Sequence, residues 1–303
     1  MASQDQSMKK WVGRVALVTG ASAGIGREIA RDLVKYGMTV VGCARNVLAI
    51  EDESSLLKEG AAPGLLHPVK CDLSQEKDIL AMFDVIWKKF GGVDVCINNA
   101  GLSHAASLLD GDTQKWKNML DVNVLAVAIC TREAVRQMAQ KGADDGQIIN
   151  INSISGHKVT QSRDSHFHTA TKFAMTAMTE GVRQELREIG SMIRIASISP
   201  GIVETEFLSR MYPDSPSKPE ALYKSLECIQ PEQISSTVRY IMELPPHVQV
   251  RQELDLNVIQ SFAWCEVQNG KNLWYNDVKV TSSEKNGTVV LKTAVLTVKS
   301  KAN

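Results

Sequence analysis

The sequence lacks both an excess of one charge and a long apolar run. Its 34 Lys and Arg residues balance its 34 Asp and Glu residues, so no net field draws the whole chain toward nucleic acid or an anionic membrane. No stretch reaches the apolar length that a membrane-spanning helix needs, and the N-terminal residues lack the apolar core of a secretion signal. We therefore expect a cytoplasmic protein with no nucleic-acid partner and no membrane span.

Cysteine is also sparse, and its spacing excludes the common metal frameworks. The six cysteines include no CxxC pair and no spacing typical of zinc sites. His166 and His168 form a His-x-His pair, but no third ligand clusters with them in the sequence. We expect mostly small buried thiols in a reducing compartment, and no bound metal.

What the sequence does have is a regular alternation of short apolar runs and longer amphipathic stretches, beginning near Arg14. This alternation is typical of βαβ units, whose strands form a parallel sheet that is buried on both faces. It predicts one α/β domain over residues 11–250, with a Rossmann-type, doubly wound parallel sheet and a C-terminal extension. The expected strands are residues 15–19, 39–43, 65–70, 93–98, 147–152 and 193–199.

Capping residues and helical spacing of apolar side chains predict four helices. Gly37 follows the first helix as a C-cap, Ser74 precedes the second as an N-cap, and Gly91-Gly92 ends the second. The other two helices are longer. The expected helices cover residues 25–36, 75–90, 116–140 and 165–189.

Two later segments depart from this pattern. Residues 201–231 are irregular and rich in proline, with several large apolar side chains, and we predict that they cover an apolar ligand. A surface crossover with a few core anchors is the alternative. Residues 251–303 form an atypical C-terminal tail, in which two alternating stretches flank Asn286-Gly287, a strong hairpin-turn dipeptide. We expect a β-hairpin or a poorly ordered tail there.

The segment from Gly20 to Gly26, with the sequence GASAGIG, has the features of a phosphate-binding turn. It follows the first expected strand and opens the first expected helix. Glycines let the backbone turn sharply and approach a pyrophosphate, whose charge is favoured by the free N–H groups and the dipole at the helix start. An ordinary glycine turn is the alternative. Because strand, turn, helix and second strand fall at βαβ spacing, we expect a dinucleotide-binding domain.

The end of the second expected strand indicates which dinucleotide binds. Folds of this kind that select NAD usually have an acid here, which accepts from the ribose 2′-hydroxyl and would repel a 2′-phosphate. This chain has Arg45 and Asn46, and the planar guanidinium of Arg45 pairs well with phosphate. We therefore expect NADP(H), with a solvated surface arginine as the alternative. Arg45 also disfavours a methyltransferase that would use the turn for adenosylmethionine.

Several motifs together resemble the short-chain dehydrogenase/reductase family over residues 11–250. The resemblance implies an oxidoreductase that interconverts a carbonyl and a secondary alcohol on an apolar small-molecule substrate, such as a steroid, an isoprenoid or a dicarbonyl. It also implies assembly as a homodimer or homotetramer. The motifs are TGASAGIG, Cys71-Asp72-Leu73, Asn98-Asn99-Ala100-Gly101, Asn123, Ser153, Lys172 and Pro200-Gly201.

The same resemblance implies roles for individual residues. Asn123 would hold a proton-relay water through a helix irregularity, Ser153 would bond the substrate oxygen, and Lys172 would bind the nicotinamide ribose and lower the pKa of the acid/base. The alternatives are a polar helix residue, a loop hydroxyl and a solvated charge. Asp72 would lie near the adenine, or would cap the following helix through Ser74. The implied cofactor contacts are Gly20, Ser22, Ala23, Gly24, Ile25, Gly26, Arg45, Asn46, Glu51, Asp72, Leu73, Asn99, Ala100, Gly101, Lys172, Pro200, Gly201, Val203 and Thr205.

One position departs from the family. His168 stands four residues before Lys172, where the family has its tyrosine acid/base. Imidazole is a competent acid/base near neutral pH, and the Lys172 cation should lower its pKa. Its nitrogen lies closer to the backbone than a phenol oxygen, and a shift of about 1 Å can cost on the order of 100-fold in rate. We therefore predict an NADP(H)-dependent oxidoreductase of reduced activity, with a catalytically silent NADP(H)-binding protein as the alternative.

Overall fold

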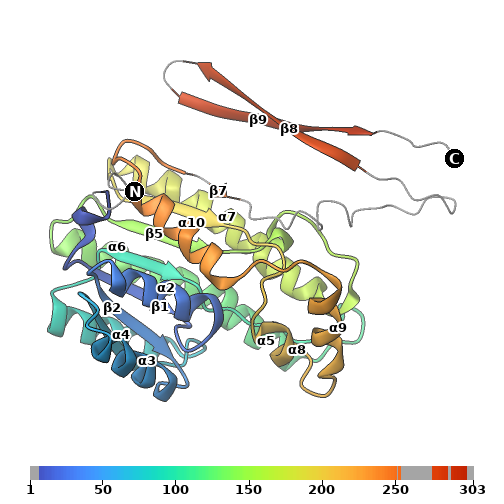
Figure 1. Cartoon of the computed structure of the whole chain (residues 1–303), viewed down its shortest axis with the longest axis horizontal. Coiled ribbons are helices and arrows are strands. Elements are labelled where there is room, and N and C mark those ends of the chain that lie inside the picture. Colours follow the sequence, from blue (N-terminus) through green and yellow to red (C-terminus); the bar gives the residue numbers. More distant parts are fainter. Residues whose placement is uncertain (1–6, 251, 254–274, 286–287, 299–303) are drawn as a thin grey trace, which may run out of the picture.

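Seven strands form one parallel sheet in the computed structural model, which describes residues 7–250, 252–253, 275–285 and 288–298 (Figure 1). The strand order is β3-β2-β1-β4-β5-β6-β7, so the direction of the crossovers reverses between β1 and β4. The expected doubly wound, Rossmann-type sheet is confirmed. The strands are β1 (Val15–Thr19), β2 (Thr39–Ala44), β3 (Leu65–Lys70), β4 (Val95–Asn98), β5 (Gln147–Ile151), β6 (Arg194–Ile198) and β7 (Gln252–Glu253).

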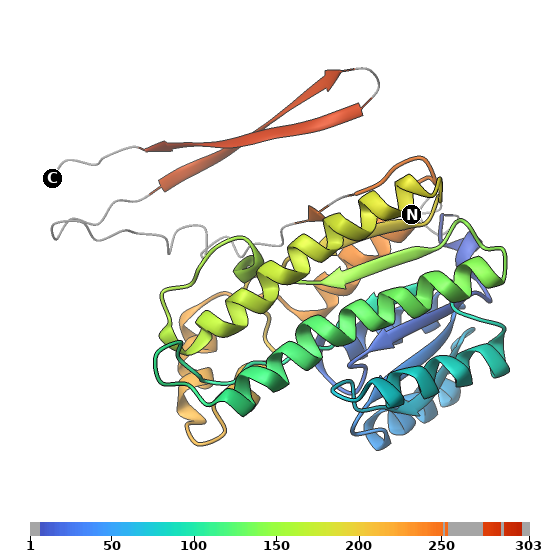
Figure 2. The ribbon, with the colours of Figure 1, turned by 180° about the vertical axis from the view of Figure 1, so that it is seen from behind.

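Helices cover both faces of this sheet. Helices α2, α3 and α10 pack on one face, and α4, α6 and α7 pack on the other, which faces the viewer in Figure 2. The helices are η1 (Met8–Trp11), α2 (Gly24–Lys35), α3 (Leu48–Glu59), α4 (Glu76–Phe90), α5 (Thr113–Leu120), η2 (Asp121–Leu125), α6 (Ala126–Gln140), η3 (Ile154–Gly156), η4 (Arg163–Ser165), α7 (His166–Glu188), α8 (Phe207–Met211), α9 (Ser217–Ser225) and α10 (Pro231–Glu243).

The two helical layers explain why the central strands β1, β4, β5 and β6 are buried along their whole length. In β1, Ala16 and Val18 pack into the core under α2 and α10, whereas Val15 and Leu17 pack into the core under α4 and α6. All five residues of β1 are buried. A sheet covered on one face only would show alternating polar residues instead. The strand ends, where the layers stop, are therefore the part of the sheet that is left to form a site.

The six expected strands are confirmed, with ends that shift by at most two residues. A seventh strand, β7, lies just past residue 250, and its residues pair with Ser197 and Ile198 of β6. The sheet thus extends beyond the expected end of the domain, and the division of the chain at residue 250 stays a prediction.

The expected helix over residues 116–140 is wrong in its details. It consists of α5, one π-helical turn (η2) and α6, and α5 begins earlier because Asp112 is its N-cap. The Asp112 carboxylate accepts a hydrogen bond from the N–H of Gln114 at 2.8 Å. A π-turn within a long helix leaves no mark in the apolar pattern, so only the family resemblance, through Asn123, pointed to an irregularity there.

Three smaller expectations also need correction. Helix α3 was not predicted, because Leu48 and Leu56 on it are exposed and its apolar pattern is weak. Gln75, not Ser74, is the N-cap residue of α4. Residues 201–231 are not irregular throughout, because they contain α8 and α9 and a bridge between Val203 and Ile229.

The C-terminal segment contains two further strands, β8 (Tyr275–Lys285) and β9 (Thr288–Val298), which pair antiparallel to each other. The dipeptide Asn286-Gly287 lies outside the described residues, so the expected turn stays a prediction. Among the helices of the described residues, none combines the length and apolarity needed to cross a bilayer. The same described residues hold no group of three or more side chains suited to a metal ion.

Candidate functional site

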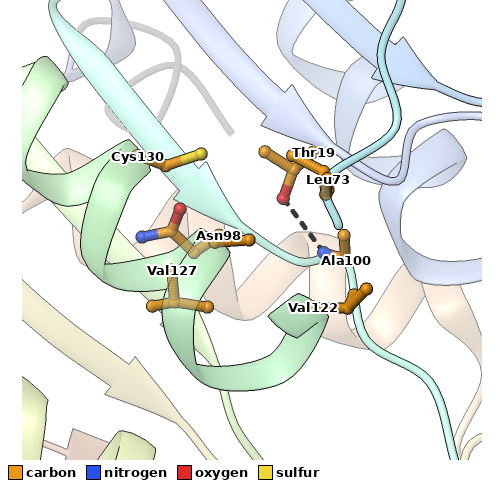
Figure 3. Close-up of a pocket in the computed structure, with 8 residues that line it drawn as sticks. Thr19, Leu73, Asn98, Ala100, Val122, Val127 and Cys130 are labelled. Carbon is orange, nitrogen blue, oxygen red and sulfur yellow. Dashed lines mark hydrogen bonds between the residues drawn. The ribbon is translucent and has the colours of Figure 1, made fainter. Parts of the chain in front are cut away.

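The candidate site begins where the first and fourth strands end side by side. The hydroxyl of Thr19, the last residue of β1, accepts hydrogen bonds from the N–H groups of Asn99 and Ala100, both at 3.0 Å. Figure 3 shows the bond to Ala100 as a dashed line. The Asn99 amide also donates to the carbonyl of Thr19 at 2.8 Å. These bonds join the loops that follow β1 and β4 at the reversal of the crossovers, where ligands of doubly wound sheets bind.

A small recess lies beside this junction, between the ends of β1 and β4 and the start of α6 (Figure 3). Two of its lining residues, Leu73 and Ala100, were implied as cofactor contacts. The sequence did not single out Val122, although it directly precedes Asn123, nor the residues from α6. The recess is lined by Thr19, Leu73, Asn98, Ala100, Val122, Ala126, Val127 and Cys130.

The glycine turn has no room for side chains at two of its positions. A Cβ added at Gly26 would lie 2.4 Å from the carbonyl oxygen of Gly20 and 2.3 Å from the amide nitrogen of Asn99. Gly24 has a φ of +52°, which is unfavourable for a residue with a side chain, and the methyl group of Thr205 lies 3.0 Å from where its Cβ would be. Both positions therefore require glycine, because the turn packs closely against the loop after β4 and against Thr205.

The N-terminus of α2 has neither a capping side chain nor an acidic residue to pair with its N–H groups. Its N-cap is Ala23, which has no side-chain acceptor, and the first turn holds no acidic residue. The helix start therefore offers unsatisfied N–H groups and the positive end of a dipole, a combination that binds phosphate. Ser22 and Ile25 are half-buried in the same turn. These features fit a pyrophosphate.

Arg45 and Asn46 follow β2, and both are exposed. Burial opposes ionisation of Asp72, but two hydrogen bonds from Ser74 and the charge of Arg45 outweigh it and lower the pKa of Asp72. Glu51, in the first turn of α3, is also exposed. An exposed guanidinium at the end of β2 therefore remains available to a phosphate.

The alternative expected for Asp72 describes part of what this side chain does. Its Oδ1 accepts from the N–H of Ser74 at 3.0 Å and from the Ser74 hydroxyl at 2.8 Å. These bonds form a local turn before α4. Ser74 therefore bonds Asp72 and is not the N-cap of the helix.

Asn123 lies in the π-turn η2, so the expected helix irregularity is present. Its side chain is fully buried, and Oδ1 accepts from the N–H of Leu102 at 2.9 Å. Its Nδ2 donates to the carbonyl of Leu102 at 2.8 Å and to the hydroxyl of Thr171 at 3.0 Å. The side chain thus links the loop after β4 to α7.

Lys172 projects from α7 toward the same loop. Its Nζ donates to the carbonyl of Ile151, the last residue of β5, at 3.0 Å, and a Cβ added at Gly101 would lie 3.8 Å from it. The side chain is buried, and this burial lowers its pKa to about 8. A buried ammonium at the end of a central strand is not the solvated charge of the alternative interpretation.

His168 lies one turn before Lys172 and is also buried. Its Nε2 has no hydrogen-bond partner, and the ring packs against Phe207 with 5.6 Å between ring centroids. Burial, and secondly the charge of Lys172, lower the pKa of His168 to about 3. The imidazole is therefore neutral at physiological pH.

Ser153 is the N-cap of η3, directly after the residue that follows β5. Its Oγ accepts from the N–H of Ser155 at 3.1 Å, so the hydroxyl can still donate its own proton to a ligand. Nearby, the N–H of Ile154 donates to the carbonyl of Pro200 at 3.0 Å. This bond brings the loop after β6, with Gly201, beside the loop after β5.

Neither tyrosine of residues 201–231 replaces the tyrosine that the family has at the position of His168. The hydroxyl of Tyr212 donates to the carboxylate of Asp164 at 3.2 Å, and the hydroxyl of Tyr223 donates to the carbonyl of Thr205 at 2.8 Å. The Nε2 atom of His166 bonds the carbonyl of Thr160 at 3.0 Å.

Comparison with known proteins agrees with this geometry. The family model for short chain dehydrogenase matches residues 14–215. Dehydrogenase/reductase SDR family member 11 of Bos taurus is 51% identical over 243 residues, which are 80% of this chain and 95% of that protein. Farnesol dehydrogenase of Aedes aegypti is 44% identical over 247 residues, 81% of this chain and 96% of its own length.

A solved structure described as the closed form of serine dehydrogenase complexed with NADP+ superposes with a TM-score of 0.74 at 27% identity. It covers 84% of this chain and 99% of its own. The reversal of the crossovers, the tightly packed glycine turn and the buried lysine at the end of β5 accord with these matches. The chain belongs to the short-chain dehydrogenase family.

Proposed function

We propose that this chain is an NADP(H)-dependent oxidoreductase that interconverts a carbonyl and a secondary alcohol on an apolar substrate, with turnover slowed by His168. The observation that carries the proposal is that Asn123 and Lys172 meet at Gly101, with His168 one helical turn before Lys172. When bound, the nicotinamide would supply the hydride chemistry. The protein would hold the cofactor, orient the substrate and supply the proton for the substrate oxygen.

Three parts of the chain would hold the dinucleotide. The N–H groups at the start of α2 suit the pyrophosphate, and the exposed guanidinium of Arg45 suits the 2′-phosphate. The Lys172 ammonium suits the hydroxyl groups of the nicotinamide ribose. Preference for NADP(H) is further supported by the structural relative that is described as complexed with NADP+.

The substrate would lie between the Ser153 hydroxyl and α8. Ser153 can donate to a carbonyl oxygen, and Phe207, Leu208 and Met211 bring apolar side chains along α8. An apolar cover fits a steroid, an isoprenoid or a dicarbonyl. The relative named farnesol dehydrogenase favours an isoprenoid carbon skeleton among these.

The acid/base step is the weak part of this site. Reduction of a carbonyl needs a proton for the oxygen, and a group with a pKa of about 3 is protonated in only on the order of one molecule in ten thousand at pH 7. Oxidation of an alcohol needs a base, and the same low pKa makes His168 a weak one. A neutral imidazole N–H can still donate a hydrogen bond to the substrate oxygen. We therefore expect slow turnover in both directions.

Fluorescence titration with NADPH and NADH, combined with a screen of carbonyl substrates, tests the proposal. Tighter binding of NADPH together with measurable NADPH oxidation supports it. Failure to bind either dinucleotide, or an equal affinity for both, would overturn the cofactor assignment.

A catalytically silent NADP(H)-binding protein is the second candidate, and one observation favours it. The Nε2 atom of His168 is buried and has no hydrogen-bond partner, so a substrate oxygen reaches it only if neighbouring side chains move. Tight NADPH binding without turnover of any carbonyl in the screen would select this candidate.

We further propose that the chain assembles as a homodimer or homotetramer through its long helices. Leu120, Leu125 and Phe173 are 45%, 53% and 41% exposed along α5, η2 and α7. Apolar side chains on neighbouring helices suit a second copy. Light scattering of the purified chain measures this, and a monomer at micromolar concentration would contradict it.

A further inference from the structure

Three threonines of α7 share one arrangement. Each hydroxyl accepts a hydrogen bond from an asparagine amide on a neighbouring element, and each donates to a backbone carbonyl. The pairs, with their Nδ2–Oγ1 distances, are Asn123–Thr171 (3.0 Å), Asn152–Thr176 (2.9 Å) and Asn150–Thr179 (2.9 Å).

Only Thr171 lies within the turn that runs from His168 to Lys172. Its hydroxyl donates to the carbonyl of His168 at 2.7 Å while it accepts from Asn123. The side chain is 1% exposed, so no bulk water can replace the hydroxyl. The backbone of His168 is thus bonded, through one oxygen, to the π-turn.

The asparagine on the other side of this bond cannot rotate away. Both protons of its Nδ2 are used, by the carbonyl of Leu102 and by Thr171, and its Oδ1 accepts from the N–H of Leu102. A flipped amide would set its oxygen against the carbonyl of Leu102. The loop after β4 therefore fixes the position of Asn123, and the bond from Asn123 to Thr171 fixes α7 relative to that loop.

These hydrogen bonds end close to Lys172, which would hold the nicotinamide ribose. Leu102 follows Gly101, where an added Cβ would lie 3.6 Å from the Oδ1 of Asn123 and 3.8 Å from the Nζ of Lys172. One hydroxyl and one amide therefore connect the loop after β4, the π-turn and the turn of α7 that carries both His168 and Lys172.

We propose that Thr171 is a positioning residue, whose hydroxyl fixes the turn from His168 to Lys172 against the π-turn. This proposal rests on the proposed function, since it concerns the same acid/base turn. Without the hydroxyl, one Nδ2 proton of Asn123 is left buried and unpartnered, and α7 loses its only bond of this kind at that turn among the described residues. A displacement of well under 1 Å is then enough to lower the rate.

Thr179 offers a matched control on the same helix. It accepts from Asn150 and donates to the carbonyl of Met175 at 2.8 Å, and it is 6% exposed, so Thr179→Val removes an equivalent pair of bonds away from His168. We expect Thr171→Val and Thr179→Val to lower the melting temperature by similar amounts.

Activity should separate the two variants, measured in the wild-type and His168→Tyr backgrounds with NADPH and a carbonyl substrate. At saturating NADPH, we expect Thr171→Val to lower kcat by about ten-fold with little change in the KM for the carbonyl substrate, and to shift the pH profile of kcat. Thr171→Ser keeps the hydroxyl, so it should retain kcat and its pH profile. Thr179→Val should also retain both. Equal kcat and equal pH profiles for Thr171→Val and Thr179→Val would overturn the proposal.

A readout without turnover separates this proposal from the function it rests on. If neither background reduces any carbonyl, the oxidoreductase proposal fails, and the side-chain amide NMR signal of Asn123 and the affinity for NADPH test Thr171 alone. A moved Asn123 signal with NADPH affinity weakened by about ten-fold supports the positioning role, because Lys172 has shifted. An unchanged affinity overturns it. Should Thr171→Val not fold, Thr171→Ala replaces it in every measurement.

Discussion

The ring of Phe207 packs against the imidazole of His168, with 5.6 Å between the ring centroids and 59° between the ring planes. Phe207 begins α8, whereas His168 lies in the first turns of α7. The contact accounts for part of the burial that lowers the pKa of His168 to about 3. The segment that contains α8 therefore contributes to the low pKa of His168, the residue in the acid/base position.

Removing that ring should raise the pKa of His168. In Phe207→Ala, water reaches the imidazole and solvates its charged form, so the pKa should move from about 3 toward its ordinary value near 6.5. NMR titration of the His168 ring signals measures this shift. Ser209→Ala, on the exposed side of α8, is the control, and equal pKa values in both variants would contradict the prediction.

His168→Tyr should raise the turnover of a carbonyl substrate with NADPH by at least about ten-fold. A phenol reaches farther from the backbone than an imidazole, and Lys172 stabilises its ionised form. Initial rates of NADPH oxidation measure the gain. His168→Phe adds a ring of similar size without an ionisable proton, and it should show none. Equal rates for the Tyr and Phe variants would count against the assigned acid/base position.

His168 should also make the fold sensitive to acid. Its native pKa of about 3 lies below the ordinary value of 6.5, so the unfolded state binds more protons between these values. Stability then falls as the pH drops from about 6.5 toward 3, by up to about 1.4 kcal/mol per pH unit from this group. Urea unfolding at pH 7 and pH 5 measures the loss, which should be smaller in His168→Phe. The same loss in both proteins would contradict the prediction.

Arg45→Ala should weaken NADPH binding and leave NADH binding nearly unchanged. A charge-assisted hydrogen bond contributes about 1.5–3 kcal/mol, which corresponds to a loss of roughly ten- to a hundred-fold in affinity for the phosphorylated dinucleotide alone. Fluorescence titration with both dinucleotides measures the ratio of the two dissociation constants. Arg187→Ala, an exposed arginine near the end of α7, serves as control. An unchanged ratio in Arg45→Ala would exclude Arg45 from the phosphate site.

Gly26→Ala should abolish binding of both dinucleotides. The new Cβ would lie 2.3 Å from the Asn99 amide nitrogen and 2.4 Å from the Gly20 carbonyl oxygen, so the turn must shift. Gly181→Ala is a matched control within α7, because nothing lies within 4 Å of its added Cβ, and it should stabilise the helix by about 1 kcal/mol. Calorimetric titration and thermal melting measure both variants. Wild-type affinity in Gly26→Ala would be incompatible with this geometry.

The fold was predictable because its signals are local. Each expected strand is a short apolar run, and the parallel sheet buries such runs on both faces, so residues 15–19 and 65–70 match β1 and β3 at both ends. The π-turn at Asn123 and helix α3 were less accessible, because neither changes the apolar pattern in a recognisable way.

The sequence by itself determined the sheet, the glycine turn and the residue types at the candidate site, since these depend on apolar periodicity and on the spacing of a few residues. Only the tertiary structure decided that Lys172 bonds the end of β5, that Phe207 packs against His168 and that Thr171 connects Asn123 to α7. These contacts join elements far apart along the chain. Burial and the partner of each polar atom set the pKa values, and neither exists until the layers have packed.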